Sequence, residues 1–127
     1  MATSPLHSFI GHPVKGAGRG KGLGTPTLNI DLNDVPKSLA HGIYAGAVVI
    51  RGKRMIAAMH FGPSPVFQAD VTFEAHILDA QIVDAPDDLT IEIHAYLRAI
   101  ADFPSVRDLQ AQIAQDIERT RAIMRSP

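Results

Sequence analysis

Most of the chain alternates apolar and polar residues with a period of two, the spacing of a β-strand that buries one of its faces. Segment 89–97 alternates in this way, and so does 71–80, where one predicted face carries Thr72, Glu74, His76 and Leu78. Segment 42–51 is instead an almost continuous apolar run with β-branched and aromatic residues, and 54–61 follows it after a turn at Gly52-Lys53. These patterns predict a hairpin over 42–61 and two further antiparallel strands, each with a single apolar face.

The two ends of the chain complete the predicted fold. Segment 8–14 has the composition of a strand, although Pro13 restricts its position to a sheet edge or a strand end. Ser105 followed by Asp108 resembles a helix-capping box. An apolar stripe at helical spacing follows it, made of Val106, Leu109, Ile113, Ala114, Ile117 and Ile123.

Short antiparallel strands followed by one amphipathic helix are typical of a small mainly β domain. We predict a six-stranded antiparallel Greek-key barrel over about 8–100, with a single C-terminal α-helix over about 105–124 packed against it. The whole of 1–127 is then one domain, which is consistent with its length and its 46% hydrophobic content.

A glycine-rich segment near the amino terminus carries the clearest chemical signal. Successive glycines let several backbone N–H groups turn toward one anion, so this segment is predicted to hold phosphate. In the Thr25-Pro-Thr-Leu-Asn29 sequence that follows, the Thr27 hydroxyl and the Asn29 amide are two residues apart and project to one side, and such oxygen ligands suit magnesium. The predicted phosphate-binding residues are Gly16, Gly18, Arg19, Gly20, Lys21, Gly22, Gly24, Thr27 and Asn29.

Two well-known phosphate loops do not match this segment. A Walker A loop requires a glycine where Lys15 stands and a hydroxyl where Gly22 stands. A dinucleotide fingerprint fails at its last glycine from every possible start, and no helix pattern follows it. A flexible glycine linker remains an alternative interpretation, although such linkers are usually rich in serine and uncharged.

Charge and cysteine content limit the possible partners and setting. The formal net charge of -1 argues against a main role on nucleic acid or a membrane surface. The chain has no cysteine, and its first residues lack the features of a signal peptide. We therefore expect a cytoplasmic monomer that acts on small molecules.

Several motifs together resemble the riboflavin kinases of bacteria and eukaryotes, in the form of an isolated kinase domain. Residues 18–29 resemble the family's Gly-Arg-Gly-Arg/Lys-x-Leu-Gly-x-Pro-Thr-x-Asn segment, and Gly42-Ile-Tyr-Ala45 its Gly-Val/Ile-Tyr-Ala. Glu74-Ala-His76-Ile-Leu78 resembles its Glu-x-His-Leu-Leu. Further similarity lies in Gly11-His-Pro-Val14, Ala58–Phe67, Tyr96-Leu-Arg98 with Phe103, and Gln112–Asp116.

The resemblance implies transfer of the γ-phosphoryl group of ATP to the 5'-hydroxyl of riboflavin, giving FMN and ADP, with Mg²⁺. It implies that Glu74 is the base that takes the proton of the attacking hydroxyl, and that Thr27 and Asn29 hold the metal. It also implies that Phe67, Phe103 and Arg98 border the flavin. The chain departs from the family around Gly62–Phe67, which lacks the usual threonine and arginine, and in the loop 80–88.

Two other functions remain open from the residues. Glu74-x-His76, Glu92-x-His94 and His60 could form a metal site in a small barrel of cupin type, because imidazole and carboxylate groups on adjacent strands can hold a transition metal. The chain could also be a flavin-binding or regulatory module without kinase activity. The glycine-rich segment is unexplained by the first alternative, and the presence of Thr27, Asn29 and Glu74 argues against the second.

Overall fold

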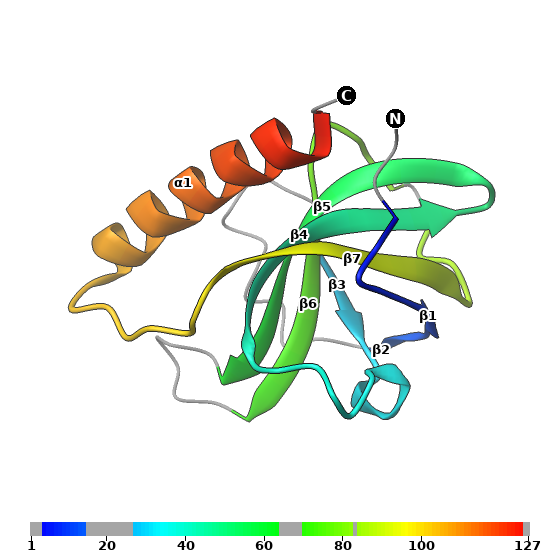
Figure 1. The fold of residues 1–127 in the computed structure, drawn as a ribbon, viewed down its shortest axis with the longest axis horizontal. Helices are drawn as coiled ribbons and strands as arrows, with labels where there is room; N and C mark the ends of the chain where they lie inside the picture. Colours follow the sequence, from blue (N-terminus) through cyan, green and yellow to red (C-terminus); the bar gives the residue numbers. More distant parts are fainter. Residues whose placement is uncertain (1–3, 15–26, 64–69, 83, 126–127) are drawn as a thin grey trace.

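The computed structural model describes residues 4–14, 27–63, 70–82 and 84–125, which form a curved sheet with one helix beside it (Figure 1). The elements in chain order are β1 (His7–Gly11), β2 (Pro13–Val14), β3 (Thr27–Ile30), a 3₁₀ turn (Leu32–Asp34), β4 (Gly42–Ile50), β5 (Lys53–Pro63), β6 (Val71–Ile77), β7 (Leu89–Arg98) and α1 (Val106–Arg125).

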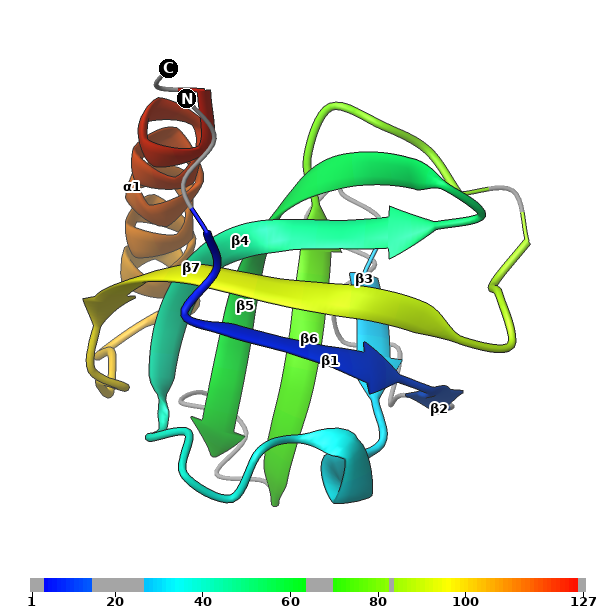
Figure 2. The same cartoon turned by 45° about the vertical axis from the view of Figure 1, so that its right-hand side comes forward.

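The strands form one antiparallel sheet in the order β1-β7-β4-β5-β6-β3-β2. Strands β4, β5 and β6 neighbour one another in sequence order and β7 returns to lie beside β4, which is Greek-key order. The sheet has seven strands, so the prediction of six was wrong. It is also an open half-barrel rather than a closed barrel (Figure 2).

Both differences from the prediction, the seventh strand and the open barrel, arise near the amino terminus. The predicted strand 8–14 is divided at His12 into β1, which pairs with β7, and β2, which pairs with β3. Because β1 and β2 run end to end with one residue between them, they cannot hydrogen-bond side by side and close the barrel. Pro13 begins β2 at the sheet edge, as the absence of its N–H requires.

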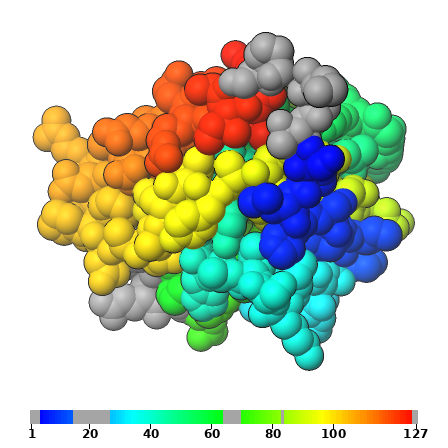
Figure 3. All heavy atoms as spheres, in the orientation of Figure 1, coloured from blue at the N-terminus to red at the C-terminus, as the bar shows by residue number. Residues whose placement is uncertain are grey.

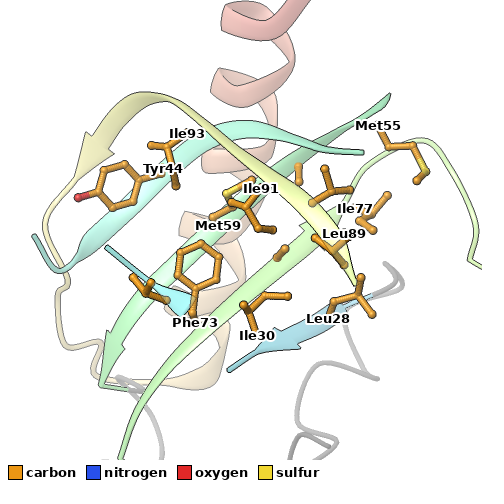
Figure 4. Packing of buried hydrophobic residues seen from close by; sticks show 14 of the residues in the cluster. Leu28, Ile30, Tyr44, Met55, Met59, Phe73, Ile77, Leu89, Ile91 and Ile93 are labelled. Carbon is orange, nitrogen blue, oxygen red and sulfur yellow. The ribbon is translucent and has the colours of Figure 1, made fainter. Parts of the chain in front are cut away.

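The inner face of the sheet holds the main hydrophobic core (Figure 4). Phe73 of β6 lies in its centre, and its ring meets that of Phe9 edge-on with centroids 5.9 Å apart. Residues of β1 and of β3 to β7 contribute to this core. Its labelled members in Figure 4 are Leu28, Ile30, Tyr44, Met55, Met59, Phe73, Ile77, Leu89, Ile91 and Ile93.

Strand β4 is buried on both faces, which explains its continuous apolar sequence. Its outer face lies under α1, where Ile43 and Ala45 form a second small cluster with Leu97, and Met124 of the helix packs against it. The predicted apolar stripe of α1 is only partly correct, because Val106 and Ile123 are exposed. The buried helix residues are Asp116 and Thr120, which are polar.

Strand β7 does not keep one apolar face along its length, contrary to the prediction. Its pairing with β4 shifts register between Ala45 and Gly46, so Ile93 lies in the inner core while Ala95 packs in the cluster under α1. Gly46 permits this irregularity, since a Cβ there would lie 1.9 Å from the carbonyl oxygen of Glu92. The bulge thus lets one strand supply both layers of the molecule.

The turn of the β4–β5 hairpin and the amino-terminal cap of α1 both have the geometry that their residues favour. The turn of the β4–β5 hairpin is Arg51-Gly52, one residue earlier than predicted, and both residues have positive φ, as a two-residue type I′ turn needs. At the start of α1 the Ser105 hydroxyl accepts the N–H of Asp108 at 3.1 Å, which confirms the predicted cap.

Candidate active site

Polar side chains of three neighbouring strands gather on the outer face of the sheet. In the β3–β6 pair, Thr27 lies opposite His76 and Asn29 lies opposite Glu74. In the β5–β6 pair, His60 lies opposite Glu74 on the other side. Because the residues between them in each strand face the inner core, these five side chains share the outer face. The structure therefore joins the Thr-Leu-Asn and Glu-Ala-His motifs, which are far apart in sequence.

The Thr27 hydroxyl lies 3.0 Å from Nδ1 of His76. Burial lowers the pKa of His76, and the nearby Glu74 charge opposes this only in part. A neutral imidazole can accept the hydroxyl proton of Thr27 at Nδ1, and the threonine oxygen then acts as an electron-pair donor. This is the property that a Mg²⁺ ligand requires, so the donor set of Thr27 and Asn29 fits a hard divalent cation.

Glu74 is partly exposed and is supported from within its own strand. Its side chain is 21% exposed, and the Thr72 hydroxyl donates a hydrogen bond of 3.3 Å to Oε2. The same Oε2 atom lies 3.9 Å from Nδ1 of His60. One carboxylate oxygen of Glu74, Oε2, thus has Thr72 and His60 as neighbours.

His60 is more deeply placed than Glu74. Its side chain is 12% exposed, and Nε2 lies 3.2 Å from the carbonyl oxygen of Pro63. Burial is the main cause that lowers the pKa of His60, the Glu74 charge and the Pro63 carbonyl oppose this, and the Arg98 charge adds slightly to the lowering.

Arg98 and Phe103, both predicted to border the flavin, lie together next to α1. The Arg98 guanidinium is 5.7 Å from the centre of the Phe103 ring. It donates to both carboxylate oxygens of the buried Asp116, with the shortest bond 2.7 Å from Nη2 to Oδ2. Arg98 therefore fixes the helix to β7, a structural role that the sequence did not indicate.

Part of the predicted site lies outside the described residues. This holds for the predicted phosphate-binding positions Gly16, Gly18, Arg19, Gly20, Lys21, Gly22 and Gly24, and for the predicted flavin contact Phe67. Their roles remain predictions.

A second Glu-x-His pair lies elsewhere on the outer face. Glu92 of β7 accepts a hydrogen bond from Arg54 at 3.1 Å and lies 3.0 Å from Nε2 of His94. These residues form an ion-paired cluster of their own, in which Arg54 of β5 reaches across β4 to Glu92 of β7. Over the ranges that the structure describes, no three His, Cys, Asp or Glu side chains are grouped closely enough to hold a metal ion, so the cupin-type alternative gains no support.

Sequence analysis assigned no catalytic part to Thr72 and considered His60 only as a metal ligand. Period-two alternation does place Thr72 on the polar face with Glu74, so the sequence pattern could have identified Thr72 as a neighbour of that carboxylate. The position of His60 beside Glu74 depends on the register of β5 against β6, which a single sequence does not reveal.

The described part of the chain includes no helix with the length and apolar character needed to span a membrane.

Fold and site together define a small antiparallel half-barrel with a carboxylate, a hydroxyl and an amide presented side by side on its outer face. The family model described as "Flavokinase: Riboflavin kinase" matches residues 4–124. The chain belongs to this family.

Two proteins whose names include riboflavin kinase are similar to this chain in sequence. The chain is 32% identical to human riboflavin kinase, over 92% of this chain and 80% of that protein. It is 29% identical to a bifunctional riboflavin kinase/FMN adenylyltransferase of Listeria monocytogenes, over 91% of this chain. It spans only 40% of the length of that bifunctional relative.

Solved structures resemble the fold. A macrolide-efflux protein from Streptococcus pneumoniae superposes with a TM-score of 0.77 at 30% identity, covering 92% of this chain and 38% of that one. Riboflavin kinase from Trypanosoma brucei superposes with a TM-score of 0.61 at 21% identity, covering 94% and 80% respectively. The second similarity supports the fold alone.

Proposed function

We propose that this protein transfers the γ-phosphoryl group of ATP to the 5'-hydroxyl of riboflavin, producing FMN and ADP. The observation that carries the proposal is the direct pairing of Thr27 with His76 and of Asn29 with Glu74, because it places a candidate base beside candidate cation ligands. Membership of the riboflavin kinase family supports the choice of substrates.

Glu74 is the base in this proposal. Thr72 and His60 lie around one of its oxygens, and the side chain retains an exposed portion that a substrate hydroxyl can approach. A carboxylate within hydrogen-bond reach orients the hydroxyl and takes its proton as the oxygen attacks phosphorus. Phosphoryl transfer needs such positioning together with neutralisation of charge.

Thr27 and Asn29 would hold Mg²⁺ together with the nucleotide phosphates. Bound there, the cation would neutralise negative charge on the phosphates during transfer. The contribution of the chain is to orient the two oxygen ligands. His76 fixes the Thr27 hydroxyl, and the antiparallel register keeps Asn29 next to Glu74.

The remaining roles follow the family resemblance. We propose that the glycine-rich segment with Arg19 and Lys21 binds the ATP phosphates, and that Phe67, Phe103 and Arg98 border the flavin. We further propose that the protein acts as a cytoplasmic monomer on small-molecule substrates, without a nucleic-acid or membrane partner.

The direct test is to incubate the protein with riboflavin, ATP and Mg²⁺ and to measure FMN by chromatography. FMN should form, and its formation should stop when the divalent cation is chelated and resume when Mg²⁺ is restored. CTP run in parallel determines the donor preference. Riboflavin binding without FMN formation would contradict the proposal and favour a flavin-binding module.

A further inference from the structure

His60 carries an unusual buried atom. Within the described ranges, its Nδ1 is the one buried side-chain nitrogen or oxygen without a hydrogen-bond partner. Its Nε2 lies 3.2 Å from the Pro63 carbonyl oxygen, which can only accept, so Nε2 carries the ring proton. Nδ1 of the neutral ring is therefore an acceptor. Such an unsatisfied group is costly, and its presence calls for an explanation.

The acceptor faces the carboxylate of Glu74. The separation between Nδ1 and Oε2 is 3.9 Å, which is too long for a hydrogen bond. It is the arrangement expected of two acceptors with no proton between them. The Thr72 hydroxyl donates to the same Oε2 atom and holds the carboxylate in place.

We propose that His60 is a positioning residue for Glu74, whose Nδ1 accepts a hydrogen bond from Glu74 after that carboxylate has taken the proton of the substrate hydroxyl. The inference rests on the proposed function. In the step, the hydroxyl O–H bond breaks and its proton moves to Oε2 of Glu74, the oxygen that faces Nδ1 of His60. The hydroxyl oxygen bonds to the γ-phosphorus of ATP, the bond from that phosphorus to the β–γ bridging oxygen breaks, and ADP leaves.

The surroundings of His60 favour this role over an ion pair. The charged and titratable groups that act on it are Glu74, His76 and Arg98. Burial and Arg98 both disfavour the imidazolium form, so the ring remains an acceptor. An acceptor that gains its partner only when Glu74 is protonated stabilises the reacting state and not the bound substrate. Its loss should therefore lower kcat and leave KM unchanged.

Three substitutions separate the two ring nitrogens. His60→Asn places an amide oxygen at the δ position, where it can accept as Nδ1 does. His60→Gln can replace the contact of Nε2 with Pro63 but offers no δ acceptor, and His60→Leu offers neither. We expect kcat for FMN formation to fall about tenfold in the Gln and Leu variants, the effect of one lost hydrogen bond. The Asn variant should stay within about threefold of the wild type.

Stability measurements exclude a merely structural effect. His60→Leu removes an unsatisfied buried acceptor, so its unfolding in urea should require at least as much denaturant as that of the wild type. In a Glu74→Gln background, His60→Leu should cause no further loss of kcat. Wild-type turnover of His60→Leu, or equal turnover of His60→Asn and His60→Leu, would overturn the inference. Absence of FMN formation by the wild type would instead overturn the proposed function.

Discussion

Two glutamates in this chain share the Glu-x-His spacing but have different surroundings. Glu92 is neutralised by Arg54, and both ion pairing with Arg54 and hydrogen bonding with His94 lower its pKa against the effect of burial. Glu74 has no such arginine pair among the described residues; it has Thr72 and His60 around it and Asn29 opposite it. Of these two glutamates, Glu74 is the one that pairs with Asn29, a proposed Mg²⁺ ligand.

Glu74→Gln should lower kcat for FMN formation by about 10²- to 10⁴-fold, because the amide cannot take the proton of the hydroxyl. Riboflavin affinity, measured by quenching of flavin fluorescence, should change little. Glu92→Gln is the matched control and should keep near-normal turnover. Equal activity of the two variants would remove the role of Glu74.

The lowered pKa values of His60 and His76 predict a dependence of stability on pH. Both remain neutral in the folded protein at a pH where the unfolded chain takes up protons, so stability is present above their ordinary pKa and is lost as pH falls below about 6.5. Each can contribute up to about 1.4 kcal/mol per pH unit. Urea unfolding between about pH 7.5 and pH 5 should show the loss, and it should be smaller in His60→Leu. A flat profile in the wild type would contradict this expectation.

The polar face that carries Glu74 was predictable from the sequence, but the neighbours of Glu74 on other strands were not. Alternation in 71–80 put Thr72, Glu74 and His76 on one polar face, and the structure agrees for these three. It fails at Leu78, which is buried because β6 ends at Ile77. The pairing of His60 with Glu74 could not be derived, because register is set by the whole sheet.

At the scale of elements, α1 is fastened to the sheet by a buried ion pair. Arg98 binds Asp116 through several hydrogen bonds, and Gln112 also donates to Asp116. The helix stripe predicted from apolar residues missed this, because a polar residue at a buried position does not differ in pattern from one on a solvated face.

Asp116→Ala should destabilise the fold by about 3–5 kcal/mol, since it leaves the Arg98 charge partly buried without its partner. The matched control is Glu118→Ala, whose side chain is 73% exposed and pairs with Arg121 within the helix. That change should cost at most about 0.5 kcal/mol. Urea denaturation of both variants gives the comparison, and similar values would show that the ion pair does not secure the helix.

Gly46→Ala should be far more damaging than Gly52→Ala, although both remove a glycine from the same hairpin. A Cβ at Gly46 would collide with the Glu92 backbone, whereas Gly52 has open space and suffers only from its φ of 81°. We expect a loss of about 1 kcal/mol at Gly52 and at least about 3 kcal/mol at Gly46, from overpacking against a rigid backbone. Thermal unfolding of the two variants checks the order, and comparable melting temperatures would contradict it.

The number and closure of strands were beyond sequence analysis for a physical reason. A pattern of period two reports that a segment is extended with one face buried, but β2 with two residues and β3 with four are too short for it to distinguish a strand from a loop. Their existence depends on pairing with each other and with β6.

The whole molecule leaves some apolar side chains on its surface at the strands nearest the amino terminus. Leu6 is 66% exposed and Ile10 61% exposed. Figure 3 shows this amino-terminal segment, in blue, on the surface beside β7. These are separate residues along one edge and not a broad patch, and single exposed apolar residues are common in soluble proteins.

We therefore predict a monomer in solution. Light scattering coupled to size exclusion should give a mass near 13.7 kDa over a wide range of protein concentration. A Leu6→Ser, Ile10→Ser double variant should elute identically. A dimer mass that disappears in the double variant would show that this edge associates with a second copy.

Strands β1 and β2 lie in one short segment at the amino terminus, and this segment protects the sheet from aggregation. The segment 7–14 covers the free side of β7 and, a residue later, that of β3, and the His12 N–H also donates to Asp34 at 2.8 Å. If segment 7–14 detaches, β7 and β3 both become edge strands, and their unpaired backbone groups can pair with another chain. Trimming a few residues at this end should therefore promote fibril-like assembly much more than its small contribution to the core would suggest.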